Sequence, residues 1–506
     1  MQETRPHSSP AQYPLRIGRP EEFSRLRQFF QACSFDDITV CRTLAITDMG
    51  RLGSVAWDTI RFDSTPVALR WCIETFLQDL PPSEERSRAI CGEEVFAAFV
   101  SLGVLRTAKQ NPANLVSAVL LHPVAGFVVV ADRPDDPDGG PFTPMEDIVF
   151  PATSAGSLQL VRFLPETRDG EALDLCGGSG IGALHLSRTA RTALTADVTE
   201  RAAHFAEFNA RLNDAPIRSL CGDLYAPVMG KQFDLISAHP PYVPAMCTKM
   251  IWRDAGDTGE DITRRIIEGL PDYLRPGGTC VITCVARDTE TKPFEQRARD
   301  WLGPSGTEFD VIFGLEKAMP LEEVAGNLQE RWLADGHQPE ELLARLRALD
   351  TRQFVNGILI LRRCGDPVPE PPARVRLSET ARAIDFDRLF AWRRRWRRPG
   401  WRKWLAGSRP RVAAEMQLNS AGATPIFRST SEVVVSTTKG FDAALRLDAW
   451  TASQISRLDG TRTVREVFSA TRRAGATPAG FTLNTFGDLV RQMIDRGFLD
   501  VELPHD

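Results

Sequence analysis

The residues best suited to chemistry follow short apolar runs in the middle of the chain. The run EALDL ends beyond Asp174 and leads into CGGSGIG, a turn that contains four glycines. Glycines permit left-handed backbone and let a ligand approach the main chain closely. The second run ends in an acid, Asp197 of ALTADVTE, and the third run is followed by CGDLY, which places Asp223 at the next such position. In an open α/β sheet these are the strand ends at which ligands bind.

The spacing of these acids indicates a class of ligand. Asp197 follows Asp174 by 23 positions, close to the ~20 residues that separate a nucleotide-binding turn from the acid that meets a ribose. No arginine accompanies Asp197, and no Lys-Ser/Thr pair follows the turn. The pattern therefore predicts a nucleoside-containing ligand and disfavours a phosphorylated dinucleotide or ATP.

A fourth apolar run ends in a rigid turn, FDLISAHPPYVPA. Pro240 and Pro241 cannot continue a strand ladder. Tyr242 is then expected at the same edge of the sheet as the acids. His239 precedes the prolines, and a histidine at this place can act as a general base or as a hydrogen-bonding group.

Strands must alternate with helices to hold these ends in line. Seven strands are predicted in the central region, at 171–175, 193–197, 217–220, 233–238, 279–285, 309–313 and 357–362. Amphipathic stretches of helical length separate most of them, as in ERAAHFAEFNARLND. Such alternation predicts an α/β fold: an open, mostly parallel, Rossmann-like sheet of seven strands, with both faces covered by helices.

The motifs DLCGGSGIG, TAD and CGDLY resemble those of class I S-adenosylmethionine-dependent methyltransferases. The resemblance implies that S-adenosylmethionine is the cofactor and that residues 174–182 wrap its methionine part. It also implies that Asp197 binds both ribose hydroxyls, while Asp223 and the backbone of Leu224 meet the adenine. The cofactor residues so predicted are Asp174, Cys176, Gly177, Gly178, Gly180, Asp197, Asp223 and Leu224.

HPPY resembles the Asn-Pro-Pro-Tyr signature of methyltransferases that act on planar nitrogens, including glutamine side-chain amides and nucleic-acid amino groups. The stretches FNARLND and GDTGEDITRRIIEGLPDYLRPGG resemble the same branch, and the likeness covers about residues 149–363. It implies that His239 and the carbonyl of Pro240 hold the target nitrogen and that Tyr242 stacks on it. Pro241, Trp252 and Arg253 are further candidates for substrate contacts.

Histidine in place of asparagine leaves several chemistries open. The first is nitrogen methylation of a peptide or protein side chain, or of a small natural-product metabolite. The second is oxygen methylation with His239 as the base, and the third is methylation of RNA or DNA. A binding scaffold that transfers nothing is the alternative from a different class, which the intact turns disfavour.

Composition limits the partners. The 506 residues include 61 basic and 66 acidic ones, a net charge of -5, so no overall attraction to nucleic acid is expected. We expect no transmembrane segment and no secretory signal. The ten cysteines form no CxxC pair and no zinc spacing, so no metal is predicted and a reduced, cytoplasmic protein is expected.

Four regions are predicted along the chain. Residues 1–145 form a helical, winged-helix-like substrate-recognition module that starts with a loose arm to about residue 20, and 146–365 form the methyltransferase domain. Residues 366–410 are a proline-rich linker that continues into WRRRWRRPGWRKW, and 411–506 form a second winged-helix-like module. The tryptophan–arginine segment, residues 392–404, could bind nucleic acid or an anionic membrane, or pack on a neighbouring element.

Overall fold

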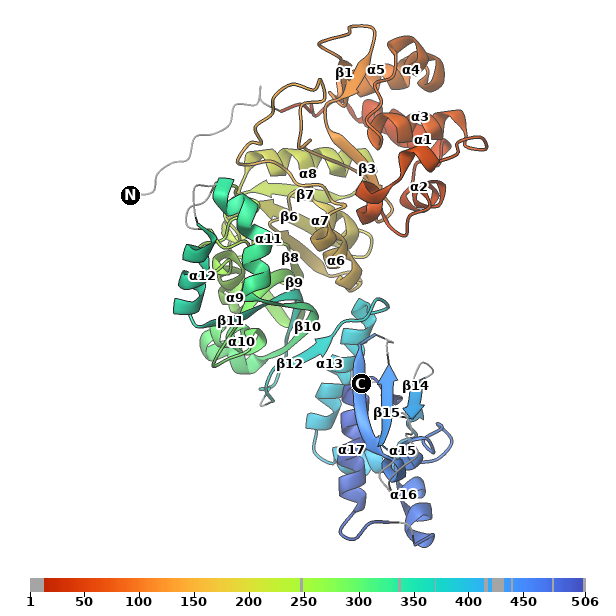
Figure 1. Cartoon of the computed structure of the whole chain (residues 1–506), viewed down its shortest axis with the longest axis vertical. Helices are drawn as coiled ribbons and strands as arrows, with labels where there is room; N and C mark the ends of the chain where they lie inside the picture. Colours follow the sequence, from red (N-terminus) through yellow and green to blue (C-terminus); the bar gives the residue numbers. More distant parts are fainter. Residues whose placement is uncertain are drawn as a thin grey trace. The chain divides into compact units, whose positions relative to one another are not determined.

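The computed structural model describes residues 13–245, 249–334, 338–368, 370–413, 417–420, 432–437, 440–475 and 477–503. Most of the predicted N-terminal arm, and Cys247, lie outside these ranges. The chain divides into two compact units (Figure 1). The N-terminal unit comprises residues 1–311 and 318–371, and the C-terminal unit comprises 312–317 and 372–506. The finer boundaries at 145, 365 and 410 stay predictions.

The N-terminal unit begins with a helical module. Its helices are α1 (Pro20–Ala32), α2 (Asp37–Leu44), α3 (Val67–Phe76), α4 (Glu84–Cys91) and α5 (Glu93–Ser101). They enclose an aromatic core in which Phe30, Trp71 and Phe99 are each at most 3% exposed. Two antiparallel pairs follow: β1 (Leu105–Thr107) with β2 (Leu115–Ser117), and β3 (Leu120–Val124) with β4 (Phe127–Ala131). Helices before short hairpins match the predicted element order, and the winged-helix identity stays a prediction.

The predicted α/β sheet is present, with one strand more than expected. Its order is β12-β10-β11-β9-β8-β5-β6-β7. The strands are β5 (Glu171–Leu175), β6 (Thr192–Asp197), β7 (Ile217–Cys221), β8 (Phe233–Ala238), β9 (Leu274–Thr289), β10 (Phe309–Pro320), β11 (Thr351–Arg363) and β12 (Ala373–Arg376). The eighth strand, β12, comes from the predicted linker, where two prolines favour extended backbone and β10 offers a parallel partner.

Helices connect these strands, and together with the parallel pairing they explain why the candidate residues share one edge. The helices are α6 (Ala155–Phe163), α7 (Ile181–Leu186), α8 (Glu200–Asn213), α9 (Asp261–Tyr273), α10 (Phe294–Trp301), α11 (Leu321–Ala334) and α12 (Pro339–Ala348). Leu175 at the end of β5 pairs with Ala196 on one side and with Ala238 on the other. Asp197 pairs with Cys221. The turns after β5, β6, β7 and β8 therefore leave the sheet side by side.

The C-terminal unit combines helices with a small antiparallel sheet. Its elements are α13 (Ala383–Arg397), α14 (Trp401–Gly407), β13 (Arg411–Val412), β14 (Gln417–Ser420), β15 (Glu432–Thr437), β16 (Ala443–Asp448), α15 (Ala449–Ile455), α16 (Val464–Arg473), α17 (Leu483–Asp495) and β17 (Leu499–Asp500). The predicted helices followed by a short strand are confirmed as α15, α16, α17 and β17. The sheet β14-β15-β16 was not predicted. No helix in the described parts of either unit is long and apolar enough to cross a bilayer.

Candidate active site

The glycine-rich turn after β5 is shaped by backbone that favours glycine. Gly178 and Gly180 have φ of 52° and 80°, and Cys176 holds a φ of 53° without being glycine. A Cβ on Gly180 would lie 3.0 Å from the Cβ of Ala206 on α8, so this glycine lets helix and turn pack closely. A Cβ on Gly178 would meet nothing within 4 Å. The turn therefore faces open space at Gly178, where a ligand can approach the backbone.

Asp174 holds the base of the turn. Its carboxylate accepts hydrogen bonds from the Ser237 hydroxyl at 2.6 Å and from the Ala183 amide at 3.1 Å. The side chain is 2% exposed, and burial raises the pKa of this carboxyl group to about 7. Asp174 thus joins β8 to the first turn of α7, and its predicted contact with the cofactor stays a prediction.

Asp197 organises the next turn and also reaches the glycine-rich one. Its carboxylate accepts hydrogen bonds from the Gly178 amide at 3.0 Å and from the Thr199 amide at 3.1 Å. Burial raises its pKa above the ordinary aspartate value. The side chain remains partly exposed at the edge of the sheet. A hydrogen-bond acceptor at this place is compatible with the hydroxyls of a ribose, and the ribose contact itself stays a prediction.

The third candidate acid has a partner that the sequence did not reveal. Asp223 forms an ion pair with Arg265 of α9, at 2.7 Å between Oδ2 and Nη2. The next residue, Leu224, has a φ of 49° and is 8% exposed. The turn after β7 therefore presents a left-handed backbone next to a carboxylate whose position α9 fixes.

The His-Pro-Pro-Tyr turn lies beside the glycine-rich turn. The His239 amide donates to the carbonyl of Leu175 at 3.4 Å, which joins the ends of β8 and β5. The rings of His239 and Tyr242 are nearly parallel, with an interplanar angle of 19° and centroids 6.0 Å apart. Burial lowers the pKa of His239 to about 4. The imidazole is therefore neutral near pH 7 and is a weak base.

The start of α6 holds the imidazole in place. Nδ1 of His239 lies 3.5 Å from the hydroxyl of Ser157, which in turn accepts a hydrogen bond from Ser154 at 3.0 Å. A Cβ on Gly156 would come within 2.5 Å of His239 Nε2, so only glycine leaves room for the ring. Sequence reasoning missed these contacts because Ser157 and His239 are 82 residues apart.

The loop after the Pro-Pro-Tyr turn packs back on it. The Val243 amide donates to the carbonyl of Arg253 at 2.9 Å, and the Arg253 guanidinium pairs with Asp254 at 2.5 Å. Trp252 stacks on Phe150, with centroids 4.5 Å apart. Both predicted substrate residues of this loop thus have structural contacts of their own, and a substrate role for them stays a prediction.

Buried ions fasten the far end of this loop. Glu260 is 3% exposed and accepts from Nε of Arg287 at 3.0 Å and from Nη2 of Arg297 at 2.6 Å. Its other oxygen accepts from the Arg287 amide at 2.8 Å. Gly259 beside it has a φ of 76° and packs against the carbonyl of Tyr242. The loop after the Pro-Pro-Tyr turn is therefore anchored to β9 and α10.

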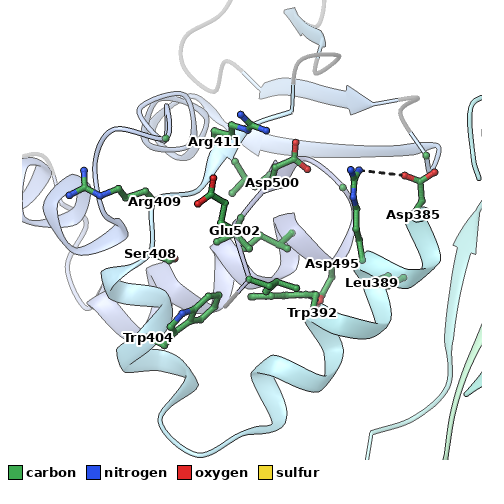
Figure 2. Close-up of a pocket in the computed structure, with 18 of the residues that line it drawn as sticks. Asp385, Leu389, Trp392, Trp404, Ser408, Arg409, Arg411, Asp495, Asp500 and Glu502 are labelled. Atoms are coloured by element: carbon green, nitrogen blue, oxygen red, sulfur yellow. Dashed lines mark hydrogen bonds and ion pairs between the residues drawn. The ribbon is translucent and has the colours of Figure 1, made fainter. Parts of the chain in front are cut away.

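The tryptophan–arginine segment packs within the C-terminal unit. Trp392 donates to Asp495 of α17 at 2.5 Å, and Arg402 pairs with Asp488 at 2.9 Å. Trp392 and Trp404 also line a cavity of about 840 Å³ that is built only from residues of this unit (Figure 2). The packing interpretation therefore accounts for these side chains, and the cavity involves none of the predicted site residues.

Comparisons with known proteins identify the central region. A family model described as the methyltransferase small domain matches residues 149–295. A protein of Methanocaldococcus jannaschii named "Putative protein N5-glutamine methyltransferase" is 31% identical over 175 residues, covering 33% of this chain and 85% of that protein. A ribosomal protein uL3 glutamine methyltransferase of Bradyrhizobium diazoefficiens is 29% identical over 206 residues, covering 35% of this chain and 63% of that protein.

A release factor glutamine methyltransferase of Geobacter sulfurreducens is 30% identical over 132 residues, covering 24% of this chain and 46% of that protein. Among solved structures, a ribosomal protein L11 methylase of Lactobacillus delbrueckii has a TM-score of 0.24 at 18% identity, over 41% of this chain and 76% of that one. The assignment therefore rests on the sequence relatives. This chain is a class I S-adenosylmethionine-dependent methyltransferase, and it belongs to the branch that contains the protein glutamine methyltransferases.

Proposed function

We propose that the chain methylates a planar nitrogen of a protein or peptide, with the glutamine side-chain amide as the first candidate. The observation that supports this most directly is the Pro-Pro-Tyr turn after β8, which lies against the end of β5 and hence beside the glycine-rich turn. The relatives named as glutamine methyltransferases support the same chemistry. Localisation in the cytoplasm, where such substrates are made, is part of the proposal.

The cofactor is assigned to the turns after β5, β6 and β7. The open side of Gly178 gives the methionine part access to the backbone. Asp197 accepts from the ribose hydroxyls, and Asp223 with the backbone of Leu224 meets the adenine. S-adenosylmethionine supplies a methyl group that is already activated on a sulfonium. The chain therefore has only to bind the two substrates, align the nitrogen with the methyl group and exclude water.

The methyl-accepting substrate is assigned to the turn after β8. The carbonyl of Pro240 accepts one N–H of the target amide, and the Tyr242 ring lies against its plane. His239 contributes a hydrogen bond from a neutral imidazole held by Ser157. Bound there, S-adenosylmethionine would give its methyl group to the nitrogen as the carbon–sulfur bond breaks, and the nitrogen would pass its extra proton to solvent when the product leaves the site.

Oxygen methylation with His239 as the base fits less well. A base whose conjugate acid has a pKa of about 4 takes a proton from a hydroxyl poorly near neutral pH, because efficient bases have a pKa near the working pH. Methylation of nucleic acid ranks after both of these reactions. The tryptophan–arginine segment, which was the candidate for binding nucleic acid, packs on α17 through Trp392 and Arg402.

The test is transfer of an isotopically labelled methyl group from S-adenosylmethionine to purified release factor, ribosomal protein uL3 and total cell protein. Mass spectrometry should locate one added methyl on a glutamine side chain, and the label should survive mild alkali, which hydrolyses methyl esters. The Asp197→Ala variant serves as the control for cofactor-dependent transfer. Label found on a carboxylate, on a hydroxyl or in RNA would refute the proposal.

A further inference from the structure

One buried side chain connects the glycine-rich turn to the helical module before it. Asn209 of α8 is 0% exposed, and its amide makes three hydrogen bonds. Oδ1 accepts from the Val130 amide at 2.8 Å, and Nδ2 donates to the carbonyl of Val130 at 3.0 Å. Nδ2 also donates to the carbonyl of Ser179 at 2.9 Å. Val130 belongs to the hairpin β3–β4, and Ser179 lies inside the glycine-rich turn.

A second asparagine one helical turn later makes a similar contact with the hairpin. Asn213 accepts from the Val128 amide at 2.9 Å and donates to the Val128 carbonyl at 2.8 Å. Its third hydrogen bond goes to the carbonyl of Asn209 in its own helix. Asn213 therefore matches Asn209 in its contacts to the hairpin, but within the described residues its remaining N–H group donates to Asn209 and not to the glycine-rich turn.

The geometry explains why two asparagines suit this place. Residues four apart on a helix lie on one face and are separated by about 6 Å along the axis. Residues two apart on a strand point their amides the same way and are separated by about 6.7 Å. The side-chain amides of Asn209 and Asn213 thus bind the backbone N–H and C=O groups of Val130 and Val128, as the backbone of a neighbouring strand would. β4 pairs with β3 on its other side.

The end of the hairpin is held to the same helix by a buried ion pair. Arg201, 2% exposed, donates from Nε to Oδ2 of Asp132 at 2.7 Å, directly after β4. The Asp132 side chain also accepts from the Val149 amide at 2.7 Å. The hairpin is therefore fixed along the length of α8, and Asn209 is the point at which this contact continues into the turn.

We propose that Asn209 is a positioning residue of the cofactor site, which couples the shape of the glycine-rich turn to docking of the hairpin β3–β4. Holding the Ser179 carbonyl fixes the peptide between Ser179 and Gly180, in the same turn as the Gly178 amide that donates to Asp197. Cofactor binding and hairpin docking then stabilise each other, because coupling between two sites acts equally in both directions. The inference rests on the proposed role of residues 174–182 in binding the cofactor.

The test compares Asn209→Ala with Asn213→Ala in the full chain. Both variants lose the contacts to β4, so we expect similar falls in the midpoint of thermal unfolding. Calorimetric titration with S-adenosylmethionine should show about tenfold weaker binding for Asn209→Ala. Asn213→Ala keeps the bond from Asn209 to Ser179 and should lose much less affinity than Asn209→Ala. Equal cofactor affinities in the two folded variants would overturn the inference.

Hydrogen exchange of the wild type tests the coupling even where Asn209→Ala does not fold. Adding S-adenosylmethionine should slow exchange of the Val130 amide, which bonds to Asn209. Unchanged exchange at this amide with saturating cofactor would refute the coupling. Two other results test the proposals on which this inference rests. Normal cofactor binding by Asp197→Ala would refute the assignment of the cofactor site. Label on an atom other than a side-chain nitrogen in the methyl-transfer assay would refute the glutamine proposal.

Discussion

Replacing His239 by asparagine distinguishes a positioning role for this side chain from a role as general base. The pKa of the imidazole is lowered from 6.5 to about 4 by burial. Only roughly one molecule in a thousand is then protonated at pH 7. A shift of this size corresponds to about 3 kcal/mol of lost basicity. We therefore expect asparagine, which can also donate and accept hydrogen bonds, to retain the rate within about tenfold.

The assay is the initial rate of methyl transfer at saturating cofactor and acceptor, for the wild type and His239→Asn, between about pH 5 and 9. If His239 only positions the substrate, neither plot of rate against pH should bend near pH 6.5, the ordinary pKa of histidine. For general base catalysis, the variant should lose about 10²–10⁴-fold. A folded His239→Asn variant that binds cofactor normally and loses at least about a hundredfold in rate would refute the positioning role.

Gly156 provides a matched control. A Cβ at this position would approach His239 Nε2 within 2.5 Å, so Gly156→Ala should displace the imidazole and slow the reaction. The shorter asparagine should tolerate the same methyl group. The double variant Gly156→Ala/His239→Asn should then lose less than the two single losses multiplied, because residues in contact give non-additive effects. Strict additivity would contradict the contact.

Three further predictions concern the cofactor, the basic segment and stability. Asp197→Ala should weaken S-adenosylmethionine binding at least about tenfold by calorimetry, since it removes charge-assisted hydrogen bonds worth ~1.5–3 kcal/mol each; unchanged affinity in a folded variant would exclude the ribose assignment. Changing the five arginines within 393–398 to glutamine should leave turnover nearly unchanged, whereas tight, salt-sensitive RNA binding by the wild type would overturn this expectation. His122, His185 and His239 have their pKa lowered to about 4 by burial. The unfolded chain therefore binds more protons between about pH 4 and 6.5, and these histidines should reduce stability as pH falls through that window. The buried Asp174, with its pKa raised to about 7, acts in the opposite direction between about pH 4 and 7. His185→Gln should lessen the acid-dependent drop in the unfolding midpoint, and an unaltered drop would refute the assignment to His185.

Much of the candidate site followed from local pattern. Apolar runs that end just after Asp174, at Asp197 and just before His239 predicted strands, and the structure has β5, β6 and β8 there. Parallel pairing then brings their ends together without further information. The long β9, from Leu274 to Thr289, extends beyond the predicted 279–285 because it pairs with β11 along most of its length. Pairing of this kind has no local signal.

The sequence by itself determined the succession of seven of the eight strands along the chain, the glycine-rich turn, the acids at the strand ends and the rigid Pro-Pro-Tyr turn. These depend on neighbouring residues and on the two-residue and 3.6-residue periods of strands and helices. Only the tertiary structure decided that Ser157 contacts His239, that Arg265 pairs with Asp223 and that Asn209 joins Ser179 to the hairpin. Each of these contacts joins residues that are 30 or more positions apart in the sequence. The burial that lowers the pKa of His239 likewise arises only when separate elements pack around one side chain.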